Sequence, residues 1–187
     1  MKSLRQEWRI EQEVRLKKRR VWFIDQMGVN RALTRAYARA PGGARAVGTA
    51  PKNYGESVTF LGAMNEEGIK AALEVRGATD ETVMLTFIQE VLAEAVEAGD
   101  VVVLDNLSSH KTLLVQAAFA ALAVEVFYLP PYSPDLNPIE KCWSKMKAFL
   151  RQVAARSYEA LSEALTAAMK TITVADAQNW IRHCGYV

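Results

Sequence analysis

Residues 101–143 read VVVLDNLSSHKTLLVQAAFAALAVEVFYLPPYSPDLNPIEKCW. The stretch opens with the β-favouring run 101–105, continues through a segment near 109–121 that predicts a helix, and returns to a β-favouring run at 124–128. Strands that alternate with a helix in this way predict parallel neighbours in one sheet. The stretch therefore places the chain in the α/β class.

The flanking sequence predicts the remaining strands and helices. Residues 21–25 (VWFID) form another short apolar run that ends in a carboxylate, and segments 57–64 and 69–75 predict an antiparallel hairpin around the turn NEEG. Apolar spacing predicts a helix over 80–98, capped by Thr79 or Asp80 and stopped by Gly99, and three more helices over 138–153, 158–171 and 174–183. We expect a mixed five-stranded sheet flanked by helices, with the antiparallel strands first.

Positive charge is concentrated near the N-terminus. Residues 1–52 hold 13 Lys or Arg against 4 Asp or Glu, a balance of +9, so that the remaining residues carry −7. We interpret residues 1–20 as a basic helical arm or linker, residues 21–187 as the main domain, and residues 30–54 as an irregular, arginine-rich excursion. This asymmetry predicts either a face for a polyanion or an ordinary solvated surface.

Other features indicate a reduced compartment and no membrane partner. Cys142 and Cys184 are far apart and show neither a zinc spacing nor a disulfide framework. The charged N-terminus lacks the apolar stretch of a signal peptide. The most apolar region, 113–131, is interrupted by Gln116 and Glu125, which argues against a membrane span. We expect a cytoplasmic location.

Three carboxylates are the candidate chemical groups. Asp25 and Asp105 end strands that, if adjacent, would bring the two side chains together. Four of the six prolines lie within residues 130–138, a stiff segment that delivers Glu140 into the first turn of a helix. Hard cations such as Mg²⁺ prefer oxygen ligands, and two of them can act together at one phosphate.

Each carboxylate also has a purely structural interpretation. Asn137 and Glu140 fit the cap and third position of a helix, and Asp105 and Asp25 could each begin a turn. Asp135 competes with Glu140 as third carboxylate, although we expect it to organise the proline-rich loop. In that case the protein would be a globular domain without metal chemistry.

Two motifs together carry a resemblance to a known family. VVVLDNLSSHK (101–111) and LPPYSPDLNPIEKCWSKMK (129–147), with 34 residues between Asp105 and Glu140, resemble the catalytic domain of the mariner-type superfamily of DDE transposases. The similarity is strongest to the bacterial insertion-sequence branch, and it spans residues 21–187. It implies a ribonuclease H-like fold of the retroviral integrase type, in which Asp25, Asp105 and Glu140 bind two Mg²⁺ ions, with Mn²⁺ as a substitute.

The resemblance also implies a reaction and its partners. Phosphodiester bonds at the ends of a transposable element would be hydrolysed, and the freed 3′ hydroxyl would attack target DNA, typically at a TA step. The partner is double-stranded DNA, bound by a homodimer, at the bacterial nucleoid. Auxiliary or DNA-contacting candidates are Asn106, His110, Lys111, Lys141, Lys145, Arg31 and Arg35. For His110 a packing role is an equal alternative, and for the lysines a solvated basic face.

Two departures from the family pattern favour an alternative. Gln26 follows Asp25 where the branch usually has Glu, and only about two dozen residues precede Asp25, whereas relatives carry helix-turn-helix domains upstream. The alternative is a catalytically silent module that binds DNA or transposase and regulates transposition.

Overall fold

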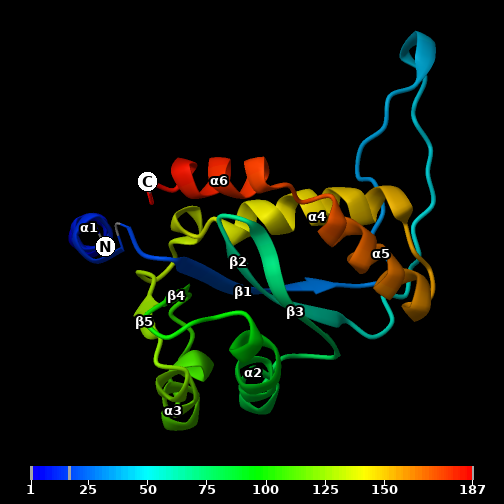
Figure 1. Ribbon diagram of the computed structural model, residues 1–187. Coiled ribbons are helices and arrows are strands. Elements are labelled where there is room, and N and C mark those ends of the chain that lie inside the picture. The colour runs from blue at the N-terminus through cyan, green and yellow to red at the C-terminus, as the bar shows by residue number, and fades with distance from the viewer. Residues whose placement is uncertain (1, 17, 187) are drawn as a thin grey trace.

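The computed structural model describes residues 2–16 and 18–186. In this part of the chain, five strands form one mixed sheet in the order β3-β2-β1-β4-β5 (Figure 1). β1 (Val21–Val29), β2 (Val58–Asn65) and β3 (Gly68–Arg76) are antiparallel neighbours, whereas β4 (Val101–Leu104) and β5 (Glu125–Tyr128) run parallel to β1. The predicted sheet is confirmed, with the antiparallel strands first.

β1 is longer than the sequence predicted. Its parallel pairing with β4 stops at Ile24 and Leu104, but its antiparallel pairing with β2 continues to Val29. The prediction that Asp25 ends a strand, and the alternative that it begins a turn, are therefore both wrong. Asp25 lies in mid-strand, directly beyond the point where β4 stops.

Helices cover both faces of the sheet (Figure 1). α4 (Ile139–Val153), α5 (Tyr158–Lys170) and α6 (Val174–His183) pack on one face, and α2 (Glu81–Thr86) and α3 (Leu113–Ala121) on the other. Successive side chains of β1 point to opposite faces of the sheet, because side chains alternate along a strand. Phe23 and Met27 join the α4 side, whereas Trp22 and Ile24 join the α2 and α3 side.

The helix predicted over 80–98 is shorter and less regular. Asp80 caps it, since its Oδ1 accepts a 2.9 Å hydrogen bond from Val83 N. Beyond α2 the chain widens into a π-helical turn, Phe87–Val91, then tightens into the 3₁₀ turn Leu92–Glu94. Phe87, Ile88 and Leu92 are all fully buried, so the irregular turns keep these side chains on the sheet.

The N-terminal arm packs against the domain. α1 (Lys2–Glu11) and the π-helical segment Gln12–Leu16 contribute Trp8 and Leu16 to the core beside Phe127. Four of its arginines pair with carboxylates of the fold: Arg5 with Asp135, Arg15 and Arg19 with Glu125, and Arg20 with Asp100. Much of the positive charge of the arm is thus neutralised within the fold.

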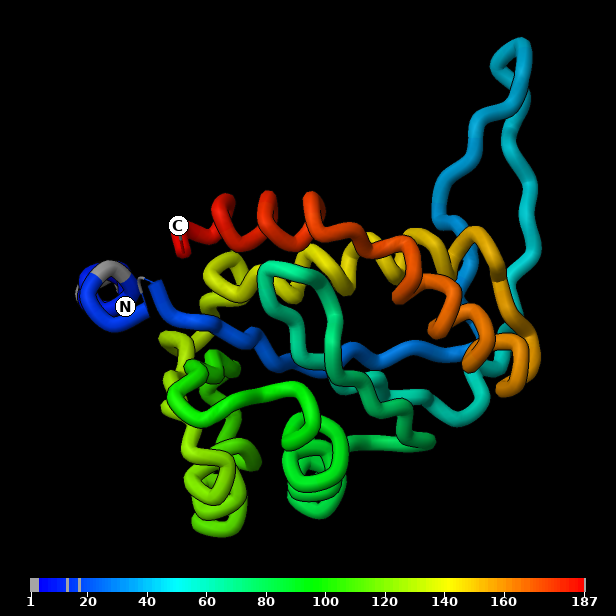
Figure 2. The backbone as a smooth tube through the Cα atoms, in the orientation of Figure 1, coloured from blue at the N-terminus to red at the C-terminus, as the bar shows by residue number. Residues whose placement is uncertain are grey.

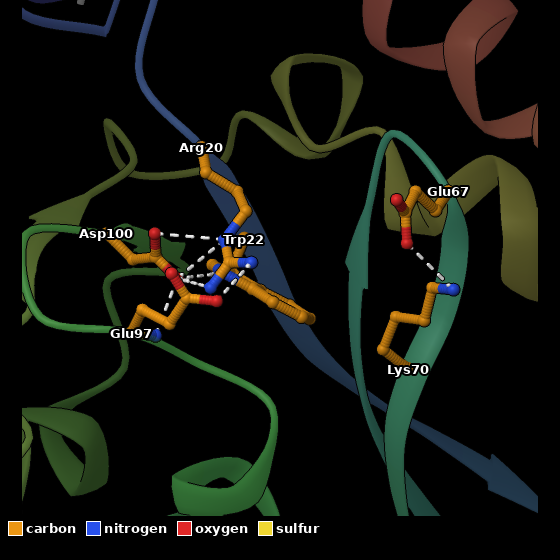
Figure 3. Close-up of polar contacts among 6 residues, drawn as sticks. All are labelled: Arg20, Trp22, Glu67, Lys70, Glu97 and Asp100. Carbon is orange, nitrogen blue, oxygen red and sulfur yellow. Dashed lines mark hydrogen bonds and ion pairs between the residues drawn. The ribbon is translucent and has the colours of Figure 1, made fainter.

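Asp100 links the starts of β1 and β4, as Figure 3 shows. Its Oδ2 accepts hydrogen bonds from Arg20 Nη2 at 2.7 Å and from the indole Nε1 of Trp22 at 2.8 Å. The backbone N–H of Glu97 donates to the same oxygen at 2.9 Å. These contacts join the starts of β1 and β4.

The predicted excursion after β1 is an extended loop that projects from the body of the molecule (Figures 1 and 2). Pro41–Gly43 forms a short 3₁₀ turn within it. Tyr37 is 92% exposed and Val47 is 90% exposed, so the segment makes little contact with the domain. Arg156 holds one end, because its Nη1 donates to the carbonyl oxygen of Arg31 at 2.8 Å. No helix in the described ranges 2–16 and 18–186 is long and apolar enough to cross a membrane.

Candidate active site

The three predicted carboxylates share one pocket of about 350 Å³. It opens where β4 ends, between β1, the loop after β5 and the start of α4. Its lining comprises Asp25, Asp105, Asn106, Leu107, Leu129, Pro130, Pro131, Tyr132, Ser133, Pro134, Asn137 and Glu140. The fold therefore brings together residues that are 80 and 35 positions apart in the sequence.

Asp25 and Asp105 converge because β1 and β4 are adjacent and parallel. Ile24 and Leu104 form the last pair of the parallel ladder, so that the next residue of each strand is an aspartate. Burial, together with the negative charges of Glu140 and Asp105, raises the pKa of Asp25 to about 7. The indole Nε1 of Trp143 donates to Asp25 Oδ2 at 2.9 Å and opposes that rise.

The Asp105 side chain makes a turn contact and also lines the pocket. Its Oδ1 accepts a 3.3 Å hydrogen bond from Leu107 N, as the turn interpretation expected. His110 is 4% exposed, and its Nδ1 lies 2.7 Å from the same oxygen, at an angle outside hydrogen-bond geometry. The turn and the packing of His110 hold the carboxylate at the edge of the pocket.

Glu140 enters the pocket from the second residue of α4. The capping interpretation is wrong: Pro138 occupies the cap position without a side-chain hydrogen bond, and Glu140 N donates to the backbone oxygen of Asn137 at 3.2 Å. The Glu140 side chain is therefore not needed to cap the helix. Burial and the charge of Asp105 raise the pKa of Glu140, while Lys147 on the same helix lowers it.

Asp135 lies outside the pocket lining. Arg5 Nη1 donates to its Oδ1 at 3.1 Å and contacts Ser133 Oγ at 3.4 Å. This ion pair fastens the proline-rich loop to α1. Asp135 thus organises the loop, and Glu140 is the acidic side chain that this segment contributes to the pocket.

The auxiliary candidates differ in whether they lie at the pocket. Asn106 lines the pocket, and its Oδ1 accepts a hydrogen bond from Lys111 Nζ, which also lies 4.9 Å from the centre of the Tyr128 ring. Lys145 is used within the fold, since its Nζ contacts Thr171 O at 2.9 Å and Asp176 Oδ2 at 2.6 Å.

The other three cationic candidates lie outside the pocket lining. Lys141 is half-buried on α4. Arg31 and Arg35 are exposed at the start of the projecting loop, where the Arg31 guanidinium packs against Gly55.

The donor set of the pocket fits a hard divalent cation. Its three acidic side chains supply the oxygen ligands that Mg²⁺ prefers, and a bound cation would offset both the burial and the repulsion that raise the pKa of Asp25. Within residues 2–16 and 18–186, no three His, Cys, Asp or Glu side chains are already arranged closely enough to hold a metal ion. The fit therefore rests on ligand chemistry and on the shared pocket.

Sequence reasoning missed the contribution of Trp143 to the site. Trp143 is only 2% exposed and lies in the hydrophobic core. Its N–H nevertheless reaches Asp25. Asn137, which is 2% exposed, was predicted as a helix cap but lines the pocket. The available signal was position, because Trp143 follows Glu140 by three residues, about one helical turn.

Comparison with known proteins gives consistent matches. A family model described as a DDE superfamily endonuclease matches residues 20–162. The Tc1 transposase of Caenorhabditis elegans is 28% identical over 125 residues, which cover 65% of this chain and 46% of that protein.

Solved structures of Mos1 transposase share the fold. A paired-end complex with the left transposon end has a TM-score of 0.76 at 16% identity, covering 97% of this chain and 56% of that one. The Mos1 catalytic domain, solved with raltegravir and Mg, has a TM-score of 0.69 at 15% identity, covering 97% and 90%. The predicted ribonuclease H-like fold is confirmed. The chain spans about half the length of the Tc1 and Mos1 transposases that it matches.

Proposed function

Because this chain belongs to the DDE superfamily of endonucleases, we propose that it is the catalytic domain of a transposase. Its substrate is double-stranded DNA: it hydrolyses phosphodiester bonds at the ends of a transposable element and joins the freed ends to target DNA. We further propose that it comes from the bacterial insertion-sequence branch, acts in the cytoplasm at the nucleoid, and works as a homodimer. The observation that carries the proposal is the single pocket shared by Asp25, Asp105 and Glu140.

Asp25, Asp105 and Glu140 would hold two Mg²⁺ ions. When bound, such ions polarise a phosphate and stabilise charge on the attacking and leaving oxygens. The side chains around them keep the ligands in place. His110 packs against Asp105, Trp143 donates to Asp25, and the proline-rich loop, tied to α1 by Asp135, fixes the start of the helix that carries Glu140.

The position of Gln26 removes one of the two arguments for the catalytically silent alternative. Met27 packs on the α4 side and Asp25 contacts Trp143 of α4, so Gln26 between them faces the other side, because side chains alternate along a strand. Gln26 is also absent from the lining of the pocket. Its substitution for the usual Glu therefore leaves the three proposed ligands unchanged.

The direct test is nicking of a supercoiled plasmid by the purified chain. We expect nicks in the presence of Mg²⁺ or Mn²⁺ and none when the metal is removed with EDTA. Binding to the plasmid without nicking at any metal concentration would instead support the silent regulatory module.

DNA binding by the projecting loop gives a separate prediction. Arg35 and Arg39 are exposed on this loop, and removing one arginine that neutralises a phosphate should reduce the slope of log K against log salt by roughly 1. The double variant Arg35→Ala, Arg39→Ala should therefore lower the slope by about 2 in fluorescence-anisotropy titrations with duplex DNA. The control is Arg182→Ala on α6, which removes an exposed arginine that contacts Asn179 at 3.1 Å. An unchanged slope in the double variant would remove the loop from the DNA-binding surface.

A further inference from the structure

We propose that Trp143 positions the carboxylate of Asp25. We also propose that β2 has a glycine at position 62 because the Trp143 ring packs directly against it. The inference rests on the proposed function, since it concerns the ability of Asp25 to hold a metal ion. It extends the site beyond the three acidic side chains to an indole on the helix that carries one of them.

The first observation is the hydrogen bond itself. Trp143 Nε1 donates to Asp25 Oδ2 at 2.9 Å, and the indole is only 2% exposed. An indole N–H can donate but cannot accept, so that it favours the charged carboxylate. Trp143 lies on α4 three residues after Glu140. The same helix therefore supplies one proposed ligand and fixes the orientation of another.

The second observation is the space that Gly62 provides. Gly62 is the direct partner of Asp25 in the antiparallel ladder between β1 and β2. A Cβ atom at this position would lie 2.6 Å from Cη2 of Trp143, a separation that real contacts essentially never show. Any larger residue would push the indole away from the sheet. The glycine is thus explained by the close approach of the Trp143 ring.

The third observation is that the ring is fixed from another side. Phe60, two residues before Gly62 on β2, meets Trp143 edge to face, with ring centres 5.9 Å apart and planes at 89°. The indole therefore has little freedom to rotate. A fixed donor fixes the Asp25 carboxylate, and hydrogen bonds that orient a metal ligand are commonly worth 10- to 100-fold in metal affinity or activity, as an order of magnitude.

The chain offers a matched control on the opposite face of the sheet. Trp22 is 1% exposed, and its Nε1 donates to Asp100 Oδ2 at 2.8 Å (Figure 3). This pair has the same chemistry and similar burial, but it lies outside the lining of the candidate pocket. Trp22→Phe and Trp143→Phe should therefore lose comparable stability, while only the second should affect the site.

The experiment measures Mn²⁺ affinity by titration with electron paramagnetic resonance, together with the Mg²⁺ dependence of nicking. Relative to wild type, Trp143→Phe should weaken Mn²⁺ binding roughly 10- to 100-fold and shift the Mg²⁺ requirement of nicking upward to match. Trp22→Phe should leave both within about 2-fold, because its hydrogen bond orients none of the proposed metal ligands. Equal Mn²⁺ affinity of wild type and a folded Trp143→Phe would overturn the positioning role.

A second measurement uses the wild-type protein, in case Trp143→Phe does not fold. The indole N–H resonances are assigned through Trp8→Phe, Trp22→Phe and Trp180→Phe variants. Substoichiometric Mn²⁺ should broaden the Trp143 resonance more strongly than that of Trp22, whose N–H contacts Asp100 and no proposed metal ligand. An unbroadened Trp143 resonance while Mn²⁺ binds would refute the inference alone. Absence of any Mn²⁺ binding by wild type would overturn the proposed function, and the inference with it.

Discussion

Asp105→Asn is expected to reduce Mg²⁺-dependent nicking by more than about 100-fold, beyond the cost of losing an outer hydrogen bond to a metal ligand. Asp105 follows β4 directly, faces the shared pocket, and contributes to the raised pKa values of Asp25 and Glu140. The substitution preserves size and the turn contact with Leu107, but removes the negative charge. Plasmid nicking, followed over a range of Mg²⁺ concentrations, measures the effect.

The matched control for this test is Asp135→Asn. Asp135 is an acidic residue of the neighbouring loop that pairs with Arg5 outside the pocket lining. This variant should retain nicking within a few-fold, because exposed ion pairs contribute little to stability. Glu140→Gln should behave like Asp105→Asn. Normal nicking by Asp105→Asn, or equal losses in Asp105→Asn and Asp135→Asn, would contradict the assignment of the site.

Asp25→Asn is expected to stabilise the metal-free protein at neutral and alkaline pH while removing its stabilisation by metal. The pKa of Asp25 is about 7 in the fold, against a usual value of 3.8. The unfolded chain therefore loses this proton first as the pH rises. The contribution of Asp25 to stability is present below pH 4 and is lost as the pH rises towards about 7.

Chemical denaturation of both proteins from pH 4 to pH 8 measures this difference. The full shift corresponds to roughly 4 kcal/mol, but solvent reaches the half-buried carboxylate, so we expect about 2 kcal/mol in favour of Asp25→Asn at pH 8. That equals roughly 4–8 °C in Tm. Saturating Mn²⁺ should reverse the order, because a ligand bound by the native state alone raises its stability. If the unfolding free energies of the two proteins instead changed in parallel with pH, Asp25 would not be the group whose ionisation destabilises the fold.

The sequence was sufficient to predict the sheet and the convergence of the carboxylates. The runs that end at Asp25 and Asp105 are strongly apolar, and parallel adjacency alone places the residues after Ile24 and Leu104 side by side. The bounds of the helices in the last third of the chain also agree closely with the predicted ones, because caps and apolar spacing are local properties of the sequence. Ser157 and Thr173 cap α5 and α6 through their own side chains.

The missed features depend on contacts between distant segments. β1 continues to Val29 because β2 pairs with it, and nothing within residues 26–29 indicates that partner. The basic arm looked available for a polyanion, but Arg5, Arg15 and Arg19 meet carboxylates more than 100 residues away. Likewise, only the fold shows that the N–H of Trp143 reaches Asp25, 118 residues away in the sequence.

The most direct measurement is a crystal structure with Mn²⁺, located by its anomalous scattering. Manganese density is expected in the pocket, contacted by carboxylate oxygens of Asp25, Asp105 and Glu140. Manganese bound only at other surfaces, with this pocket empty at concentrations that support nicking, would contradict this expectation.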